Sequence, residues 1–179
     1  DRFYNRALAE GWLVDYLVQP NDFRLVADIG TAIFWPDGKM KNLKKVMLLE
    51  FSDFQCPFCK QVQGTLMKLR SSYGKKVHFA YRHFPLPFHK QARGLAEAAE
   101  CARDQGRFWE TQALMYQNPP NSIELNQLIE TVQKAGVKNL SEFKQCFISG
   151  KYKPRVLKDL RDGSQIGIQG TPKVNIVTF

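Results

Sequence analysis

The stretch VMLLEFSDFQCPFCK constrains the fold of this chain more than any other part of the sequence. Residues 46–52 form a nearly continuous apolar run, which is typical of a strand buried on both faces of a sheet. Cys56 and Cys59 follow after a short loop, and Pro57 between them suits the first turn of a helix, where its missing N–H has no partner to lose. The pattern therefore predicts a buried strand, a cysteine pair and a helix over 57–71.

The following segments predict a second strand and then a long helical region. Residues 77–82 alternate apolar and polar side chains, as a strand does. The cysteine pair therefore lies at the carboxyl end of the first strand, the edge where α/β sheets place their sites. Strand character returns only in 170–179. Between the two strand regions the periodicity predicts helices at 89–104, 107–116, 122–135, 141–148 and 154–163.

A Cys-x-x-Cys pair at the start of a helix, next to a strand–helix–strand pattern, is typical of a thioredoxin-like redox domain. Such a core needs only one crossover helix here, so the surplus helices predict an insertion. We therefore expect an α/β protein with a thioredoxin-like fold and an inserted all-helical subdomain. Its parts are a core at 46–84 and 168–179, the insertion at 85–167, and an N-terminal extension at 1–45 with a helix (2–18) and a short strand or hairpin (23–35).

The composition argues against several other classes of protein. A hydrophobic content of 44% and a charged content of 24% are those of a soluble globular domain. No apolar run approaches the ~20 residues of a membrane-spanning helix, and the start at Asp1 shows no signal-peptide pattern. The net charge of +9 is interleaved with 17 acidic residues and accompanies no nucleic-acid-binding motif, so no nucleic acid partner is expected.

The cysteine pair has the arrangement needed for thiol–disulfide exchange. Unpaired N–H groups and the macrodipole at a helix N-terminus stabilise negative charge, so the reactive thiolate of Cys56 should be favoured there. We expect this sulfur to be exposed. Cys59 lies one turn inside the helix on the same side as Val62 and Leu66, shielded from large substrates. Cys56 is therefore the expected nucleophile and Cys59 the resolving cysteine.

Two further residues leave alternatives open. Glu50 interrupts the apolar strand, where a carboxylate is costly unless it is paired or protonated. It either accepts the proton of Cys59 during exchange or sits at a strand end and reaches water or a lysine. The bond between Thr171 and Pro172 precedes the last strand, and the residues alone allow it to be cis or trans.

Other chemistries fit the sequence less well. A zinc site would require His83 and His89 to converge on the cysteine pair, and a second Cys-x-x-Cys is absent. Haem attachment needs a histidine where Lys60 stands. A hydrolase dyad of Cys56 and His83 would leave Cys59 without a role. We expect no metal, no cofactor and a structural role for both histidines.

Three motifs in this order resemble the DsbA-like family of thiol–disulfide oxidoreductases, within the thioredoxin superfamily. They are EFSDFQCPFCK, YRHFPLPFHKQARGLAEAAECARDQGRFWE and GIQGTP, and the resemblance covers about 46–172. It implies a thioredoxin fold with a helical insertion and catalytic roles for four residues: Cys56, Cys59, Glu50 as a buried acid and Pro172 as a cis proline.

The resemblance also implies a substrate-binding region and a structural pair. Thr171 would offer its backbone to a substrate strand, while Pro57 and Phe58 would lie in the same region and tune the reduction potential. Cys101 and Cys146 fall in separate predicted helices. They are either two buried free thiols or the structural disulfide that some DsbA-like proteins carry, which would stabilise by ~2–4 kcal/mol and favour an oxidising compartment.

The function implied is that of an oxidase that introduces disulfides into exported proteins, in the periplasm or elsewhere in the extracytoplasmic cell envelope. Its partners would be reduced or misfolded exported proteins and a DsbB-like membrane redox partner, with the chain a monomer or homodimer. One alternative is a disulfide isomerase or reductase that uses residues 1–45 as an oligomerisation arm. The non-redox alternatives are a structural metal-binding module and a client-binding module.

The chain departs from the family pattern at three places. Residues 1–45 do not match the usual short lead-in. Lys173 stands where a small or apolar residue usually follows Thr-Pro. After Phe179 the family pattern would continue with another strand and a helix that covers the sheet.

Overall fold

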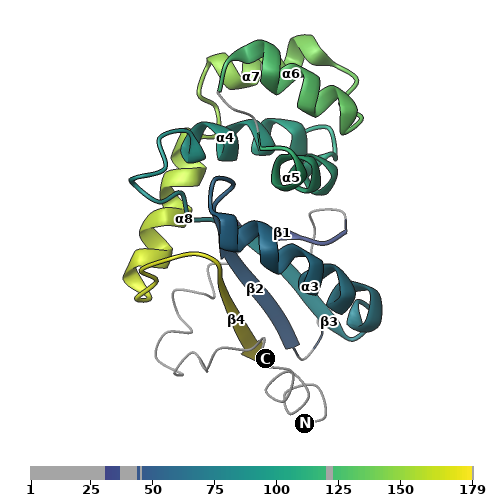
Figure 1. Ribbon diagram of the computed structural model, residues 1–179, viewed down its shortest axis with the longest axis vertical. Helices are drawn as coiled ribbons and strands as arrows, with labels where there is room; N and C mark the ends of the chain where they lie inside the picture. Colours follow the sequence, from purple (N-terminus) through teal and green to yellow (C-terminus); the bar gives the residue numbers. More distant parts are fainter. Residues whose placement is uncertain (1–30, 37–43, 45, 120–122, 179) are drawn as a thin grey trace.

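The computed structural model describes residues 31–36, 44, 46–119 and 123–178. The helix expected at 2–18 and most of the extension expected at 1–45 lie outside these residues. Figure 1 shows the sheet with α3 across it, a group of helices from α4 to α7, and α8 running alongside both. None of the helices in the described part of the chain is long and apolar enough to cross a membrane.

The sheet has four strands in the order β1-β3-β2-β4. Strand β2 runs parallel to β3 and antiparallel to β4, and β1 is antiparallel to β3. In this register Glu50 on β2 lies opposite Tyr81 and Val174. The four strands are β1 (Ile33–Phe34), β2 (Val46–Ser52), β3 (Val77–His83) and β4 (Lys173–Thr178).

Strand β2 has the predicted bounds, and β3 extends one residue beyond the predicted 77–82, although its burial does not follow the alternation of its sequence. All seven residues of β3 are buried, including the polar His78, Arg82 and His83. Buried charges need partners, and the helices supply them to Arg82 and His83. The polar side chains of this strand therefore contact other parts of the protein and do not face solvent.

The helices fall close to their predicted places. They are α3 (Pro57–Tyr73), α4 (Ala92–Arg103), α5 (Phe108–Gln117), α6 (Leu125–Lys134), α7 (Leu140–Ile148) and α8 (Lys153–Gln165). Helix α4 starts three residues later than predicted, because the chain before it is held as a loop against the cysteine segment. The N–H of Gln91, at the end of this loop, donates to the side chain of Gln55 at 2.7 Å.

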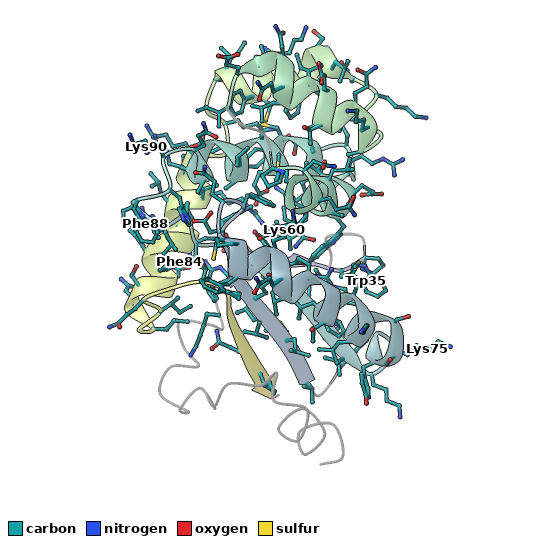
Figure 2. All side chains as sticks on the ribbon, in the orientation of Figure 1. Trp35, Lys60, Lys75, Phe84, Phe88 and Lys90 are labelled. Atoms are coloured by element: carbon teal, nitrogen blue, oxygen red, sulfur yellow. A yellow bond between two sulfur atoms is a disulfide. The ribbon has the colours of Figure 1, made fainter. Side chains whose placement is uncertain are left out.

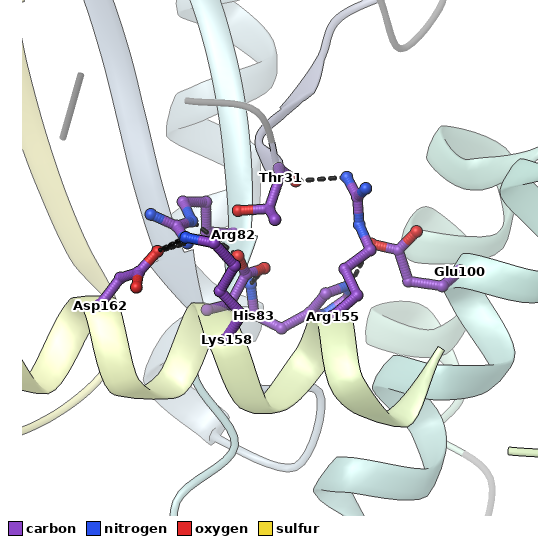
Figure 3. Close-up of polar contacts among 8 residues, drawn as sticks. Thr31, Arg82, His83, Glu100, Arg155, Lys158 and Asp162 are labelled. Carbon is purple, nitrogen blue, oxygen red and sulfur yellow. Dashed lines mark hydrogen bonds and ion pairs between the residues drawn. The ribbon is translucent and has the colours of Figure 1, made fainter. Parts of the chain in front are cut away.

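Helix α8 is anchored to the sheet by buried ion pairs (Figure 3). The Arg82 guanidinium donates to Asp159 at 2.7 Å and also pairs with Asp162. Asp159 accepts the backbone N–H of His83 at 2.9 Å as well. Gly163 allows close approach at this interface, because a Cβ there would lie 2.7 Å from the ring of Phe84.

A second cluster links α8 to α4 through the fully buried Glu100. Its carboxylate accepts from Arg155 at 2.6 Å and from Arg103 at 2.5 Å, and His83 Nε2 lies 3.4 Å away. Burial raises the pKa of Glu100, but the hydrogen bond from His83 and the positive charges of His83, Arg155 and Arg103 outweigh burial. Together they lower the pKa of Glu100 to about 2. Helix α8 thus packs on the sheet and on helix α4 alike.

The helical region is also cross-linked. Cys101 of α4 and Cys146 of α7 form a disulfide with an S–S distance of 1.97 Å. The two cysteines are 45 residues apart in the sequence, so the bond closes the segment that contains α5 and α6.

Candidate active site

The loop before the cysteine pair is organised by the buried carboxylate of Asp53. Its Oδ1 accepts the backbone N–H of Gln55 at 2.7 Å. Its Oδ2 accepts the N–H of Leu86 at 2.8 Å and lies 2.8 Å from Nδ1 of His89. The backbone carbonyl of Asp53 also accepts the N–H of Cys56 at 3.1 Å. These bonds fix the position of the first cysteine against the loop that leads to α4.

Cys56 occupies the N-cap position of α3, with extended backbone angles (φ −78°, ψ 120°) and no side-chain capping bond. Its thiol donates to the carbonyl of Thr171 at 3.3 Å, which brings together residues 115 positions apart. The Thr171–Pro172 peptide bond is cis. Both Cys56 and Cys59 are free thiols, so this is the dithiol form of the site.

The expectation that the Cys56 sulfur is exposed is wrong for this form, because the residue is only 4% exposed. The Thr171 carbonyl lies against the sulfur, 3.3 Å away, in the region where the resemblance placed Thr171 and Pro172. Phe58 beside it is 64% exposed. Phe88, which Figure 2 labels, is 71% exposed. Its ring packs edge to face on the ring of His89, with 4.6 Å between the two ring centroids. Apolar rings therefore remain open to solvent close to the cysteine loop.

Cys59 is completely buried, one turn inside α3. Burial raises the pKa of Cys59 to about 12, although bonds from the side chains of Ser52 and Thr171 and from the Asp53 backbone oppose the rise. The Cys59 thiol therefore keeps its proton at neutral pH. If Cys59 is to act as a nucleophile, a nearby group must accept that proton.

Glu50 is a buried acid on the strand beneath α3. Its Oε1 accepts from Nε2 of Gln63 at 2.8 Å, and the same nitrogen donates to the Cys59 carbonyl at 3.2 Å. Its Oε2 is buried without a hydrogen-bond partner in the described part of the chain. Burial raises the pKa of Glu50, and the positive charge of Arg70 opposes that rise. The alternative of a strand-end carboxylate that reaches water or a lysine is wrong, because Gln63 and Arg70 occupy its surroundings.

A row of buried hydroxyls lies beside these groups. Ser52 Oγ is 2.8 Å from the hydroxyl of Tyr116, which is 3.2 Å from the hydroxyl of Tyr81. Burial raises the pKa of both tyrosines well above the ordinary value, so they remain neutral donors and acceptors. Sequence reasoning missed this row. Ser52 carries a usable signal, since it lies two residues after Glu50 on a strand and therefore on the same face.

The histidines considered as metal ligands or bases lie elsewhere. His83 is buried between β3 and α4, with Glu100 as its charged neighbour and the ring of Tyr81 at 5.2 Å. His89 is bonded to Asp53. Across the described residues, no group of three or more potential metal-ligating side chains comes together. The residues that do converge are Cys56, Cys59, Glu50 and the Thr171–Pro172 turn.

The sequence that contains this site matches a known protein family. Residues 41–177 match the family model described as thioredoxin. Among curated relatives, the chain is 33% identical over 128 residues to a protein named Na(+)/H(+) antiporter NhaA 1 from Mycolicibacterium gilvum. The match covers 70% of this chain but only 20% of that protein. The chain thus spans about a fifth of the length of such relatives.

Solved structures agree on the fold. BdbD from Bacillus subtilis, in its oxidised form, superposes with a TM-score of 0.71 at 20% identity and covers 84% of each chain. Reduced DsbA from Mycobacterium tuberculosis gives a TM-score of 0.62 at 22% identity, with 82% of each chain covered. These matches confirm the thioredoxin-like fold expected from the sequence.

Proposed function

The chain belongs to the thioredoxin family, and from that premise we propose that it is a thiol–disulfide oxidoreductase that introduces disulfides into exported proteins through Cys56. One observation carries the proposal. The Cys56 sulfur sits at the N-cap of α3, 3.3 Å from the carbonyl that precedes the cis Pro172, while Cys59 is completely buried one turn behind it. This asymmetry gives the two thiols different tasks.

The exchange begins with the Cys56–Cys59 disulfide. A client thiolate attacks Sγ of Cys56, the bond between the two cysteines breaks, and Cys59 leaves as a thiolate. A second client thiolate then attacks the client sulfur of the mixed disulfide, and Cys56 leaves as a thiolate. Two electrons pass from the client to the enzyme, and the client gains one disulfide.

The buried groups handle the proton of Cys59. Since burial raises the pKa of Cys59 to about 12, the departing thiolate must take up a proton. Glu50, whose pKa is raised by burial, holds a proton at higher pH than an ordinary carboxyl and is the nearby acid that supplies it. In the reverse direction the same carboxylate accepts that proton and frees Cys59 to attack the mixed disulfide.

The client would be held beside the nucleophile by backbone and apolar contacts. The carbonyl of Thr171 bonds to the Cys56 thiol in the dithiol form, and its backbone becomes available to an extended client segment once that bond is lost. Phe58 is largely exposed next to Cys56 and suits contact with an apolar, unfolded client. Pro57, which begins α3, lies in the same exposed turn.

The structural disulfide supports the proposed compartment, and the direction of exchange is open to a direct test. The disulfide between Cys101 and Cys146 favours an oxidising location, because structural disulfides are rare in the reducing cytosol. We assign the chain to the extracytoplasmic cell envelope, where a membrane redox partner would restore the Cys56–Cys59 disulfide. Equilibration with glutathione buffers tests the direction: a potential near the reducing cytosolic poise would replace the oxidase by a reductase.

Trapping of the mixed disulfide tests the proposed nucleophile. The variant Cys59→Ser is first converted to the mixed disulfide between Cys56 and glutathione and then mixed with a reduced unfolded protein. A client thiolate should displace glutathione as its thiolate, so that a covalent complex through Cys56 accumulates, which dithiothreitol releases. The matched variant Cys56→Ser, treated in the same way, should form far less, because Cys59 is completely buried and burial raises its pKa to about 12. Equal trapping by both variants would contradict the assignment of Cys56 as the nucleophile. No trapping by either would favour a redox-inert client-binding module, and zinc in the purified protein would favour a metal-binding one.

A further inference from the structure

A cavity separate from the cysteine pair lies between α3 and α5. Its volume is about 600 Å³, within the range of small-molecule sites. Neither Cys56 nor Cys59 is among its lining residues. Figure 2 labels Lys60 near the start of α3 and Trp35 near its end, and both line this cavity. Most of the lining surface is apolar, with walls that include Trp35, Met67, Trp109, Ala113 and Tyr116.

The wall at Trp109 is held in place from two sides. Its indole N–H donates to the carbonyl of Phe34 at 3.1 Å. The guanidinium of Arg70 lies 4.5 Å from the centre of its ring, in a cation–π contact. The aromatic wall is therefore fixed before any ligand arrives, which favours binding because little ordering is required.

Two residues that line the cavity each carry a buried side-chain donor with no acceptor among the described residues. These donors are Nε of Arg70 and Nε2 of Gln112. Gln112 is only 2% exposed. A buried donor without an acceptor is costly, so a ligand oxygen that reached either donor would be stabilised.

The charge of the lining favours an anion. Lys60 and Arg70 contribute two cations, whereas the lining carboxylate of Glu110 is paired with Arg107 at 2.9 Å. Glu50 acts electrostatically on Arg70, and burial raises the pKa of that acid.

We propose that this cavity binds a small amphipathic carboxylic acid, with an apolar ring against Trp35 and Trp109 and its carboxylate on Arg70 and Gln112. The site lies beside the redox groups, because Gln63 and Tyr116 line it and also bond to Glu50 and Ser52. Binding itself requires no exchange chemistry, so the proposal stands or fails independently of the proposed function.

Calorimetric titration of the full chain with 2-naphthaleneacetate and its neutral amide tests the site. We expect one acid molecule per chain and at least tenfold weaker binding of the amide. Arg70→Met should reduce affinity for the acid to that for the amide, while Lys68→Met, an equal change of charge on an exposed position of α3, should leave it unchanged.

A second pair of variants tests the cavity and not the charge. A Cβ added at Gly64, which lines the cavity, meets nothing within 4 Å. Gly64→Phe should therefore fill the space and abolish binding, while Gly64→Ala should retain it. Absence of acid binding, equal binding of acid and amide, or unchanged binding by a folded Gly64→Phe would overturn the proposal. If Gly64→Phe does not fold, the Arg70→Met result decides.

Discussion

The most informative perturbation isolates the buried thiol. The chain has four cysteines, and Cys101 and Cys146 are bonded to each other. In Cys56→Ser, Cys59 is therefore the only free thiol. Its pKa rises from 9.0 to about 12 through burial, and the neighbouring Cys56 is the smallest of the causes. At pH 9 an ordinary thiol is half ionised, whereas Cys59 should be ionised in about one molecule per thousand, since each pKa unit is a factor of ten.

Thiolate absorbance at 240 nm measures this directly. The difference between Cys56→Ser and Cys56→Ser/Cys59→Ser, followed from pH 7 to 11, cancels the contribution of the tyrosines. We expect no thiolate step below about pH 11. Adding Ser52→Ala should move ionisation still higher, because the Ser52 bond stabilises the thiolate. A step near pH 9 in the folded variant would refute the argument that burial controls this thiol.

Three further predictions concern stability, each measured by urea denaturation. Replacing both Cys101 and Cys146 with alanine should cost about 4 kcal/mol, from the loop-closure entropy of a 45-residue separation, and a loss below about 1 kcal/mol would contradict this. Glu50→Gln should stabilise the fold at neutral pH. The pKa of Glu50 in the folded state is raised above its unfolded value of 4.5, so the native chain loses stability as the pH rises from 4.5 through the folded-state pKa. Below pH 4 Glu50 is protonated in both states, and the stabilisation by Glu50→Gln should vanish. Gly163→Ala should destabilise the fold by ~1–3 kcal/mol, because the new Cβ would lie 2.7 Å from the ring of Phe84. This steric cost should exceed the gain in helix propensity that alanine brings. A net stabilisation would argue against close packing of α8 on the sheet.

Local patterns were enough to predict the elements that are built from apolar periodicity. The run 46–52 became β2 with the same bounds, because it is mostly apolar, with only Glu50 and Ser52 polar, as suits a strand buried on both faces. Helix α3 ran two residues beyond the predicted end because no breaker precedes Gly74. The start of α3 was predicted correctly from Pro57, which suits the first turn of a helix.

The parts that could not be predicted depend on contacts between distant segments. The alternation of apolar and polar residues in β3 did not indicate that the whole strand is buried, with Arg82 paired to Asp159, 77 residues later. The burial of Cys56 depends on Thr171, and the neighbours of Glu50 come from α3. No local pattern specifies such pairings, so a sequence identifies the reactive residues more readily than it describes their surroundings.

Transfer of a disulfide to a dithiol peptide tests the central claim most directly. The oxidised chain is mixed with a reduced peptide that carries two cysteines, remaining thiols are alkylated, and both products are weighed and mapped by mass spectrometry. We expect the peptide to lose two hydrogens and the chain to gain two, with new alkylation at Cys56 and Cys59 only. A peptide that stays reduced, or alkylation that appears instead at Cys101 and Cys146, would contradict the assignment of the exchange to the N-terminus of α3.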